Sequence, residues 1–194
     1  MRLVFGLLIG YIIGSIPFSY LVGKIIGRVD LREKGSGNLG TTNVIRNLGL
    51  AAGILAYVLD MLKGLIPVLL VHRFWGYSPA IMTGIGAIVG HCYSLFFNFQ
   101  GGKGIAVSSG VLFALDPLIA MILITGQLII FFTTRMMGLA SIGFEIVHRR
   151  VGAAVLASSF VVDKSTYGTY VFCHFISSSL VFFYIYMAYL LNAL

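Results

Sequence analysis

Two glycine-rich segments hold most of the polar side chains in this chain that could bind a ligand or react with one. The first reads GSGNLGTTNVIRNLG at positions 35–49, and the second reads QGGKGIAVSSG at positions 100–110. Glycine allows neighbouring backbone N–H groups to turn toward one point, and a helix N-terminus adds unpaired N–H groups and a positive dipole end. Each segment is therefore expected to bind an anion such as a phosphate group.

Cationic and hydrogen-bonding side chains accompany these glycines. Arg46 can form a forked pair of hydrogen bonds with a phosphate, and Lys103 adds a point charge where the second segment runs into an apolar helix. The first segment also supplies neutral donors, namely Ser36, Asn38, Thr41, Thr42 and Asn43. The residues alone leave a second interpretation open, in which the glycines only make turns and the charges meet lipid headgroups.

Neither segment fits a nucleotide-binding motif. Residues 35–40 match G-x-G-x-x-G, and Asp60 follows about 20 residues later, where dinucleotide-binding folds place an acidic residue. That motif requires a preceding strand, whereas this segment lies between two long apolar stretches. The second segment lacks the G-x-x-x-x-G-K-[ST] spacing of a P-loop. Both nucleotide-binding interpretations are rejected, and no nucleic-acid partner is expected.

The composition identifies the environment in which these segments must work. The 194 residues are 59% hydrophobic and only 10% charged. A soluble domain carries about 25% charged residues, so this chain cannot cover a water-facing surface. The net charge of +7, from 13 Lys and Arg against 6 Asp and Glu, is typical of cytoplasmic loops and also suits anionic lipids or phosphorylated ligands. We therefore predict an all-α polytopic integral membrane helix bundle, with residues 1–194 as a single transmembrane domain.

About seven membrane spans are predicted, because a spanning helix needs roughly 20 apolar residues. They are expected near residues 3–26, 50–71, 79–97, 105–115, 118–134, 136–162 and 170–194. Pro17 interrupts the first of them. Basic residues gather in the loops after the first, third and fifth spans, which lie on one side if the chain alternates across the bilayer. That side is expected to be cytoplasmic, so the N-terminus lies outside.

Titratable side chains within the apolar stretches have structural interpretations as well as catalytic ones. His91 could act as a general base near neutral pH, although buried histidines are as often structural hydrogen-bonding groups. Asp60 and Lys63 lie one helical turn apart, which favours a structural ion pair over contact with a substrate. His148 and His174 are interpreted as core or interface residues, and no metal site is predicted.

The longer motifs carry a resemblance to a known family. GSGNLGTTNVIRNLG resembles the first signature of the acyl-phosphate-dependent glycerol-3-phosphate acyltransferases, the PlsY family. LDMLKG at 59–64, GHCYSLFFNFQGGKGIAVSSG at 90–110 and LASI at 139–142 resemble its later motifs and follow in the same order. The resemblance covers about residues 1–142, whereas residues 143–194 match the family poorly.

The resemblance implies a seven-span enzyme of the bacterial cytoplasmic (inner) membrane that serves phospholipid synthesis. It implies transfer of a fatty acyl group from acyl phosphate to the sn-1 hydroxyl of glycerol 3-phosphate, which gives lysophosphatidic acid and phosphate. A separate soluble phosphate acyltransferase would supply the donor. Neither a cofactor nor a metal is implied, and acyl-CoA and acyl carrier protein are not donors in this family.

The resemblance also assigns residues to the site. Ser36 and Arg46 match the essential serine and arginine of the family, and His91 and Lys103 are taken with them as catalytic. The expected substrate-binding residues are Gly35, Gly37, Asn38, Gly40, Thr41, Asn43, Gly101, Gly102, Gly104 and Ser141. Of these, Gly101, Gly102 and Gly104, together with Lys103, match the glycerol-3-phosphate-binding turn of the family. Ser36 is interpreted as a hydrogen-bond donor to phosphate in preference to a nucleophile, because no histidine and aspartate pair stands beside it in the sequence.

Three departures from the family pattern bear on function. Ser94 stands where the family usually has proline, and Gln100 stands where it usually has lysine. The basic segment near the family's C-terminus is also missing, since this chain ends in YMAYLLNAL. Two alternatives stay open: a transporter of small phosphorylated anions, and an inactive relative that binds lipid. The inverted halves of many transporters are not visible in the sequence.

Overall fold

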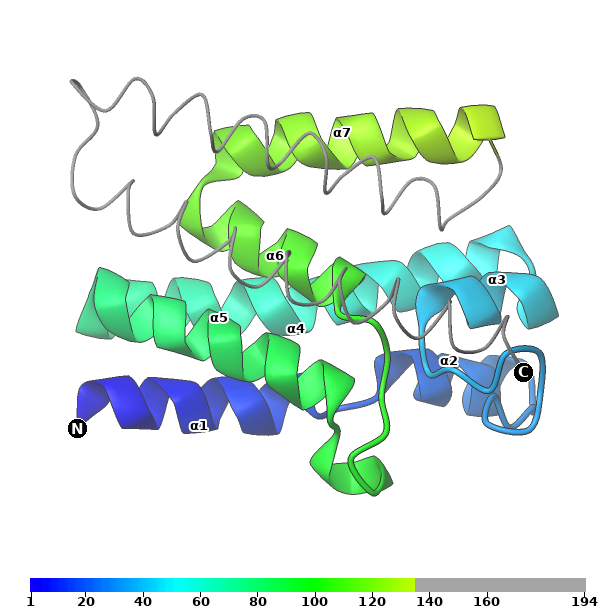
Figure 1. The fold of residues 1–194 in the computed structure, drawn as a ribbon, viewed down its shortest axis with the longest axis horizontal. Coiled ribbons are helices and arrows are strands. Elements are labelled where there is room, and N and C mark those ends of the chain that lie inside the picture. Colours follow the sequence, from blue (N-terminus) through cyan, green and yellow to red (C-terminus); the bar gives the residue numbers. More distant parts are fainter. Residues whose placement is uncertain (135–194) are drawn as a thin grey trace, which may run out of the picture. The chain divides into compact units, whose positions relative to one another are not determined.

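The computed structural model of the chain describes residues 1–134, and every regular element in that range is helical (Figure 1). The elements are α1 (Arg2–Gly14), α2 (Phe18–Ile26), α3 (Thr41–Leu48), α4 (Leu50–Trp75), α5 (Tyr77–Cys92), the 3-10 helix η1 (Leu95–Phe97), α6 (Ile105–Leu115) and α7 (Pro117–Thr134). Residues 1–117 form one compact unit, and a second unit begins at Leu118. The all-α prediction is confirmed for the part of the chain that is described.

Within residues 1–134, three segments are long and apolar enough to cross a membrane, and all three were expected. They are Arg2–Ile26, Leu50–Trp75 and Tyr77–Phe97, while Ile105–Leu115 is apolar but shorter. The break before Pro117 was also expected, because proline disfavours helix in the residue that precedes it. The predicted sixth and seventh spans, together with Ser141, lie outside the described residues. The total of seven spans therefore stays a prediction.

The first span is broken in its middle, and the break frees two carbonyl groups. Pro17 lacks an N–H and cannot continue a helix, so α1 ends at Gly14 and α2 begins at Phe18. The Ser94 hydroxyl donates to the carbonyl oxygen of Ser15 at 2.6 Å. The Lys63 ammonium donates to that of Ile16, also at 2.6 Å. Because lipid offers no hydrogen bonds, these partners are what make the break tolerable within a bilayer.

One turn is shorter than expected. The predicted spans near 50–71 and 79–97 leave residues 72–78, HRFWGYS, as the turn between them, but α4 continues to Trp75 and α5 begins at Tyr77. Gly76 alone connects the two helices, with φ at +88°. A positive φ, which glycine adopts without strain, ends one helix and starts the next at this single residue, so the aromatic and basic residues before it remain helical.

α1 and α5 pack with their backbones in contact through glycines spaced four residues apart. Figure 1 shows the two helices side by side and running in the same direction. A Cβ atom placed on Gly10 would overlap the carbonyl oxygen of Thr83, and one on Gly14 would overlap that of Ala87. On α5, a Cβ atom on Gly90 would overlap the Tyr11 carbonyl oxygen. Small residues at this spacing are how membrane helices approach closely.

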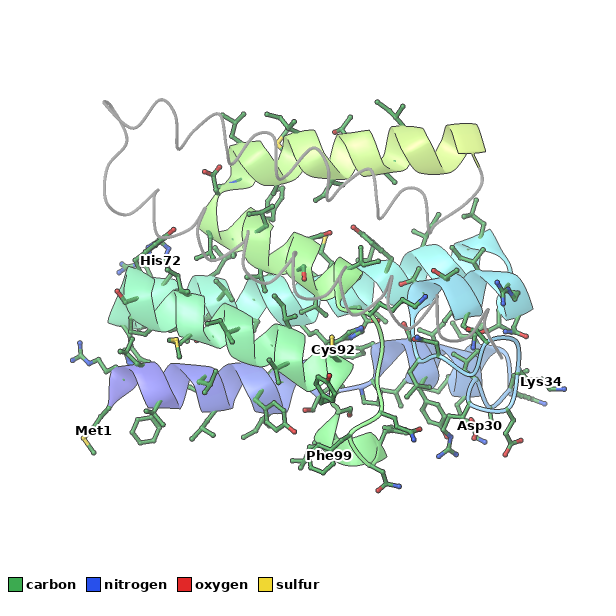
Figure 2. The ribbon with its side chains drawn as sticks, in the orientation of Figure 1. Met1, Asp30, Lys34, His72, Cys92 and Phe99 are labelled. Atoms are coloured by element: carbon green, nitrogen blue, oxygen red, sulfur yellow. The ribbon has the colours of Figure 1, made fainter. Side chains whose placement is uncertain are left out.

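The parallel course of α1 and α5 determines where the two glycine segments lie. The first segment follows the α1–α2 span and the second follows α5, so both come after helices that run away from Met1, and in Figure 1 the first segment lies at the far end of the 1–117 unit and the second nearer its middle. Figure 2 shows Asp30 and Lys34 at this end and Met1 and His72 at the opposite end. Beneath the first segment lies a small apolar core of Val22, Leu31, Leu39, Val44, Ala52 and Ala56.

Candidate active site

The first glycine segment is a compact loop that leads into α3. Gly35 and Gly37 have φ values of +61° and +68°, which other residues adopt only with strain. The buried amide of Asn43 holds this turn in place. Its nitrogen donates to the carbonyl oxygens of Leu31 and Lys34, both at 3.0 Å, and its oxygen accepts from the N–H of Ser36 at 3.1 Å. These bonds occupy the Asn43 amide within the loop.

The Asn43 amide, which the resemblance places among the substrate-binding residues, makes its hydrogen bonds within the loop. Its amide oxygen also accepts from the Asn47 amide nitrogen at 3.0 Å. Both hydrogens of its own nitrogen are already donated, so little capacity remains for a ligand. The geometry favours a role in holding the Gly35–Ser36 turn. Asn47, which the sequence analysis did not single out, shares this role, and its one-turn spacing from Asn43 was the available signal.

The side chains of Ser36 and Arg46 are both exposed on this loop. A Cβ atom placed on Gly35 would lie 3.4 Å from the Cδ atom of Arg46, so the arginine passes directly beside the turn that carries Ser36. Residues 1–134 contain no ion pair or hydrogen bond to the Arg46 guanidinium. An exposed guanidinium beside a glycine turn can bind a phosphate through two parallel hydrogen bonds.

Asn38, Gly40 and Thr41 complete the loop. The amide oxygen of Asn38 is buried and has no hydrogen-bond partner among the described residues. A Cβ atom on Gly40 would lie 3.3 Å from that oxygen. Gly40 is extended and precedes Thr41, the half-buried first residue of α3. A buried acceptor without a partner suits the hydroxyl group of a ligand, because it accepts a hydrogen bond and would repel a phosphate oxygen.

The second glycine segment folds back onto the end of α5. The N–H of Gly102 donates to the carbonyl oxygen of His91 at 3.0 Å. A Cβ atom on Gly101 would overlap that carbonyl oxygen, and one on Gly102 would overlap the His91 Nε2 atom. Gly104 then starts α6 with φ at +81°, as expected for glycines that run directly into a helix. Lys103 is exposed between them.

The two glycine segments touch. The carbonyl oxygen of Leu39, in the first segment, lies 3.1 Å from the position of a Cβ atom on Gly102. A second contact supports the same arrangement: the rings of Tyr20 and Phe97 meet edge to face, with centroids 4.6 Å apart. The guanidinium of Arg32 lies 5.4 Å from the first ring centroid and 5.5 Å from the second. The sequence placed both segments on one side of the membrane, and the structure brings them together.

Arg32 is committed to an acidic neighbour. Its Nε atom donates to one Asp30 carboxylate oxygen at 3.0 Å and its second guanidinium nitrogen donates to the other at 2.7 Å. The forked bonds from Arg32 hold the pKa of the Asp30 carboxyl well below its usual value. Lys24 lies 4.0 Å from the same carboxylate. Arg32, counted in the sequence among the basic loop charges, is therefore part of the loop's scaffold.

Below the second segment lies a buried group of charged and polar side chains. Lys63 forms an ion pair with Asp60 at 2.8 Å, which confirms the expected pairing along α4. Ser19 donates to the other Asp60 oxygen at 2.7 Å, and the Nδ1 atom of His91 lies 3.7 Å from the first. The sequence did not predict that Ser19 or His91 would join this pair. Among the described residues, no group of His, Cys, Asp and Glu could hold a metal ion.

Comparisons with known proteins agree with the motifs. The sequence model of the family described as glycerol-3-phosphate acyltransferase matches residues 4–192. A glycerol-3-phosphate acyltransferase of Aquifex aeolicus is 43% identical over 144 residues, which cover 73% of this chain and 74% of the relative. One of Bacillus cytotoxicus is 42% identical over 158 residues, which cover 81% of this chain and 77% of the relative.

Solved structures give the same result for the fold. A crystal structure of PlsY (YgiH), an integral membrane glycerol 3-phosphate acyltransferase, in its glycerol 3-phosphate form matches with a TM-score of 0.78 at 32% identity. The match covers 100% of this chain and 94% of that one. The lysophosphatidic acid form matches with a TM-score of 0.79 at 30% identity, over 100% and 93% of the two chains. The chain is an integral membrane protein and belongs to the glycerol-3-phosphate acyltransferase family.

Proposed function

We propose that this chain transfers a fatty acyl group from acyl phosphate to the sn-1 hydroxyl of glycerol 3-phosphate. The products are lysophosphatidic acid and phosphate. The observation that supports the proposal is the contact between the two glycine segments at Leu39 and Gly102. Two substrates that each carry a phosphate need two anion sites at close range, and a pair of touching glycine turns beside Arg46 and Lys103 suits that need.

The reaction needs little acid or base from the protein. The hydroxyl oxygen forms a bond to the acyl carbon, the bond from that carbon to the phosphate oxygen breaks, and the hydroxyl proton moves to an oxygen of the leaving phosphate. Because acyl phosphate is already activated, positioning and charge stabilisation supply the catalysis. Arg46 and Lys103 stabilise the phosphate charges, and the Ser36 hydroxyl donates a hydrogen bond to a phosphate oxygen.

The membrane arrangement proposed with this activity has seven spans in a single domain over residues 1–194. The N-terminus lies outside and the two glycine segments face the cytoplasm of a bacterial inner membrane. The excess of basic residues in the loop after the first span supports this orientation. A cytoplasmic site also suits a donor that is made by a soluble phosphate acyltransferase. Gly101 and Gly104 are proposed to line the same site.

Purified protein in lipid tests the activity directly. Acyl phosphate and glycerol 3-phosphate should give lysophosphatidic acid and phosphate in equal amounts, whereas acyl-CoA in place of acyl phosphate should give no product. Product from acyl-CoA alone would contradict the proposed donor. Uptake of glycerol 3-phosphate into vesicles without any product would favour a transporter. Lipid binding without turnover would favour an inactive relative.

A further inference from the structure

His91 supports the second glycine segment from below. Its side chain is only 6% exposed and lies in the last turn of α5. The His91 carbonyl oxygen accepts the N–H of Gly102 at 3.0 Å, and the Nε2 atom lies where a side chain on Gly102 would begin. The imidazole and the backbone of the turn are therefore in direct contact. Any side chain at position 102 would displace either the ring or the turn.

Asp60 faces the opposite nitrogen of the ring. Its Oδ1 atom lies 3.7 Å from the His91 Nδ1 atom and 2.8 Å from the Lys63 ammonium. Its Oδ2 atom accepts from the Ser19 hydroxyl at 2.7 Å, and Lys63 also donates to the carbonyl oxygen of Ile16. Residues at the break in the first span therefore hold Asp60 in place. Asp60 in turn limits how far the His91 imidazole can move.

These contacts form one continuous line through the molecule. They begin at the α1–α2 break, pass through Asp60 to His91, and reach Gly102, whose other neighbour is the Leu39 carbonyl oxygen of the first segment. Asp60, Lys63 and His91 are all buried. Burying charged groups costs free energy, and apolar residues in place of a buried ion pair often give equal or greater stability. The buried charges of this group therefore suggest a role other than stability.

We propose that Asp60 and His91 are positioning residues, which hold the Gly101–Gly102 turn against the first glycine segment and so set its affinity for glycerol 3-phosphate. The identity of that ligand rests on the proposed function. Neither side chain touches the substrate, because both act through the backbone of Gly102. This assignment differs from a general base, for which the Nε2 atom of His91 would have to reach the hydroxyl of the substrate.

A double-mutant cycle between His91 and Gly102 tests the contact. In Gly102→Ala, the new methyl group should push the turn off the ring and raise the KM for glycerol 3-phosphate by about tenfold, with kcat nearly unchanged. His91→Ala should raise the same KM through loss of the support. In the double variant His91→Ala/Gly102→Ala, the new methyl group occupies the space that the ring has left. Its KM for glycerol 3-phosphate should therefore be no higher than that of either single variant. Effects that multiply in the double variant would overturn the proposal.

Gly101 provides the matched control for this cycle. A methyl group there would meet the carbonyl oxygens of His91 and Cys92, which are backbone atoms. Removal of the His91 side chain leaves these atoms in place, so His91→Ala should not rescue Gly101→Ala. Rescue at both positions would show a general loosening of the loop and would contradict a specific contact between His91 and Gly102.

Asp60 is tested by a variant with the same shape. Asp60→Asn should raise the KM for glycerol 3-phosphate while kcat and the pH dependence of kcat stay close to those of the wild type. If Asp60→Asn lowered kcat and shifted its pH profile, Asp60 and His91 would act together in proton transfer and the proposal would be wrong. Since Asp60→Asn leaves Lys63 charged and buried, Asp60→Asn/Lys63→Met is the second variant. In that double variant the His91 ring is less restrained. Gly102→Ala should therefore raise the KM for glycerol 3-phosphate by a smaller factor there than in the wild type.

Calorimetric binding of glycerol 3-phosphate separates this proposal from the proposed reaction. The dissociation constants of the wild type and the variants need no acyl donor. If the wild type binds glycerol 3-phosphate and the cycle is non-additive, the positioning role stands even where acyl phosphate gives no product. If the wild type turns over acyl phosphate but the cycle is additive, the reaction stands and the positioning role fails.

Discussion

The hydroxyl of Ser94 donates a hydrogen bond to the carbonyl oxygen of Ser15 at 2.6 Å, across 79 positions of sequence. Both residues are buried. The acceptor is one of the carbonyl groups freed by the break at Pro17, and the donor stands where the family usually has proline. The backbone of Ser94 has φ at −64°, which is the value a proline would impose. The position therefore retains the backbone that proline requires and adds a side-chain bond to the first span.

Replacement of Ser94 by alanine is predicted to destabilise the protein. The Ser15 carbonyl oxygen would lose a buried partner, which costs about 1–3 kcal/mol in the free energy of unfolding. Thermal unfolding in a defined detergent would measure the loss. Ser94→Pro is the informative comparison, because proline loses the same bond but restricts the unfolded chain, which returns about 0.4–1 kcal/mol. Equal stability of Ser94→Ala and the wild type would show that the bond contributes nothing.

Arg46 is predicted to require its guanidinium and not only its charge. Arg46→Lys should lower turnover at least about tenfold, because a lysine cannot make two parallel hydrogen bonds to one phosphate. The assay is lysophosphatidic acid formation from acyl phosphate and glycerol 3-phosphate. Arg28→Lys is the matched control, since Arg28 is an exposed arginine of the same connection between the first two spans. If Arg46→Lys retained full turnover, the phosphate-binding role given to the first loop would be wrong.

Local features of this fold were predictable from the sequence because their causes are local. Pro17 and Pro117 each mark a break between two helices, although Pro67 lies inside α4, and the ranges of the apolar stretches follow from the thickness of a bilayer. The Asp60 and Lys63 pairing follows from one-turn spacing inside an apolar helix. The start of α6 after Gly104 follows from the glycines that precede it. Each of these predictions uses residues within a few positions of one another.

The parts that could not be predicted depend on residues far apart in the chain. The contact of Leu39 with Gly102 joins the two glycine segments, and the approach of His91 to Asp60 joins α5 to α4. Asn43 looked like a substrate ligand because it is polar and lies in a glycine segment. Its burial, which turns it into a support for the loop, comes from the core beneath α3. Polarity is visible in a sequence, whereas burial depends on the tertiary fold.

The glycine contact between α1 and α5 predicts a destabilising Gly10→Ala variant. Helix propensity alone would make this change favourable by about 1 kcal/mol, since glycine weakens helix interiors. The new methyl group would overlap the Thr83 carbonyl oxygen, which belongs to a helix backbone and cannot rotate away. Overpacking of this kind costs about 1–3 kcal/mol, so the net effect should be destabilising.

Unfolding in detergent would measure the sign of this effect. Leu8→Ala serves as the control on the same helix, because the Leu8 side chain is 49% exposed. That variant should unfold close to the wild type. A stabilised Gly10→Ala variant would mean that helix propensity outweighs the contact, and α1 and α5 would then have to lie further apart than the structure has them.

Asp30 is predicted to make the loop end of the protein sensitive to acid. Arg32 lowers the pKa of the Asp30 carboxyl in the folded state, so the folded protein binds the proton more weakly than the unfolded chain does. The stabilisation is therefore complete above the usual carboxyl pKa of 3.8 and is lost as the pH falls below that value. Asp30→Asn removes this contribution, so its stability should change less than that of the wild type between about pH 7 and about pH 3.

The comparison requires a variant that removes a carboxylate without breaking this pair. Glu33→Gln does so, since Glu33 is exposed in the same loop and the forked bonds of Arg32 go to Asp30. Across the pH series, the stability of Glu33→Gln should change as much as that of the wild type, whereas the stability of Asp30→Asn should change less. High salt should reduce this difference between Asp30→Asn and the wild type, because the ion pair is at the surface and is screened. Parallel curves of stability against pH for the wild type and Asp30→Asn would show that the forked contact between Arg32 and Asp30 does not persist in solution. Asp30 would then not be what holds Arg32 beside Tyr20 and Phe97.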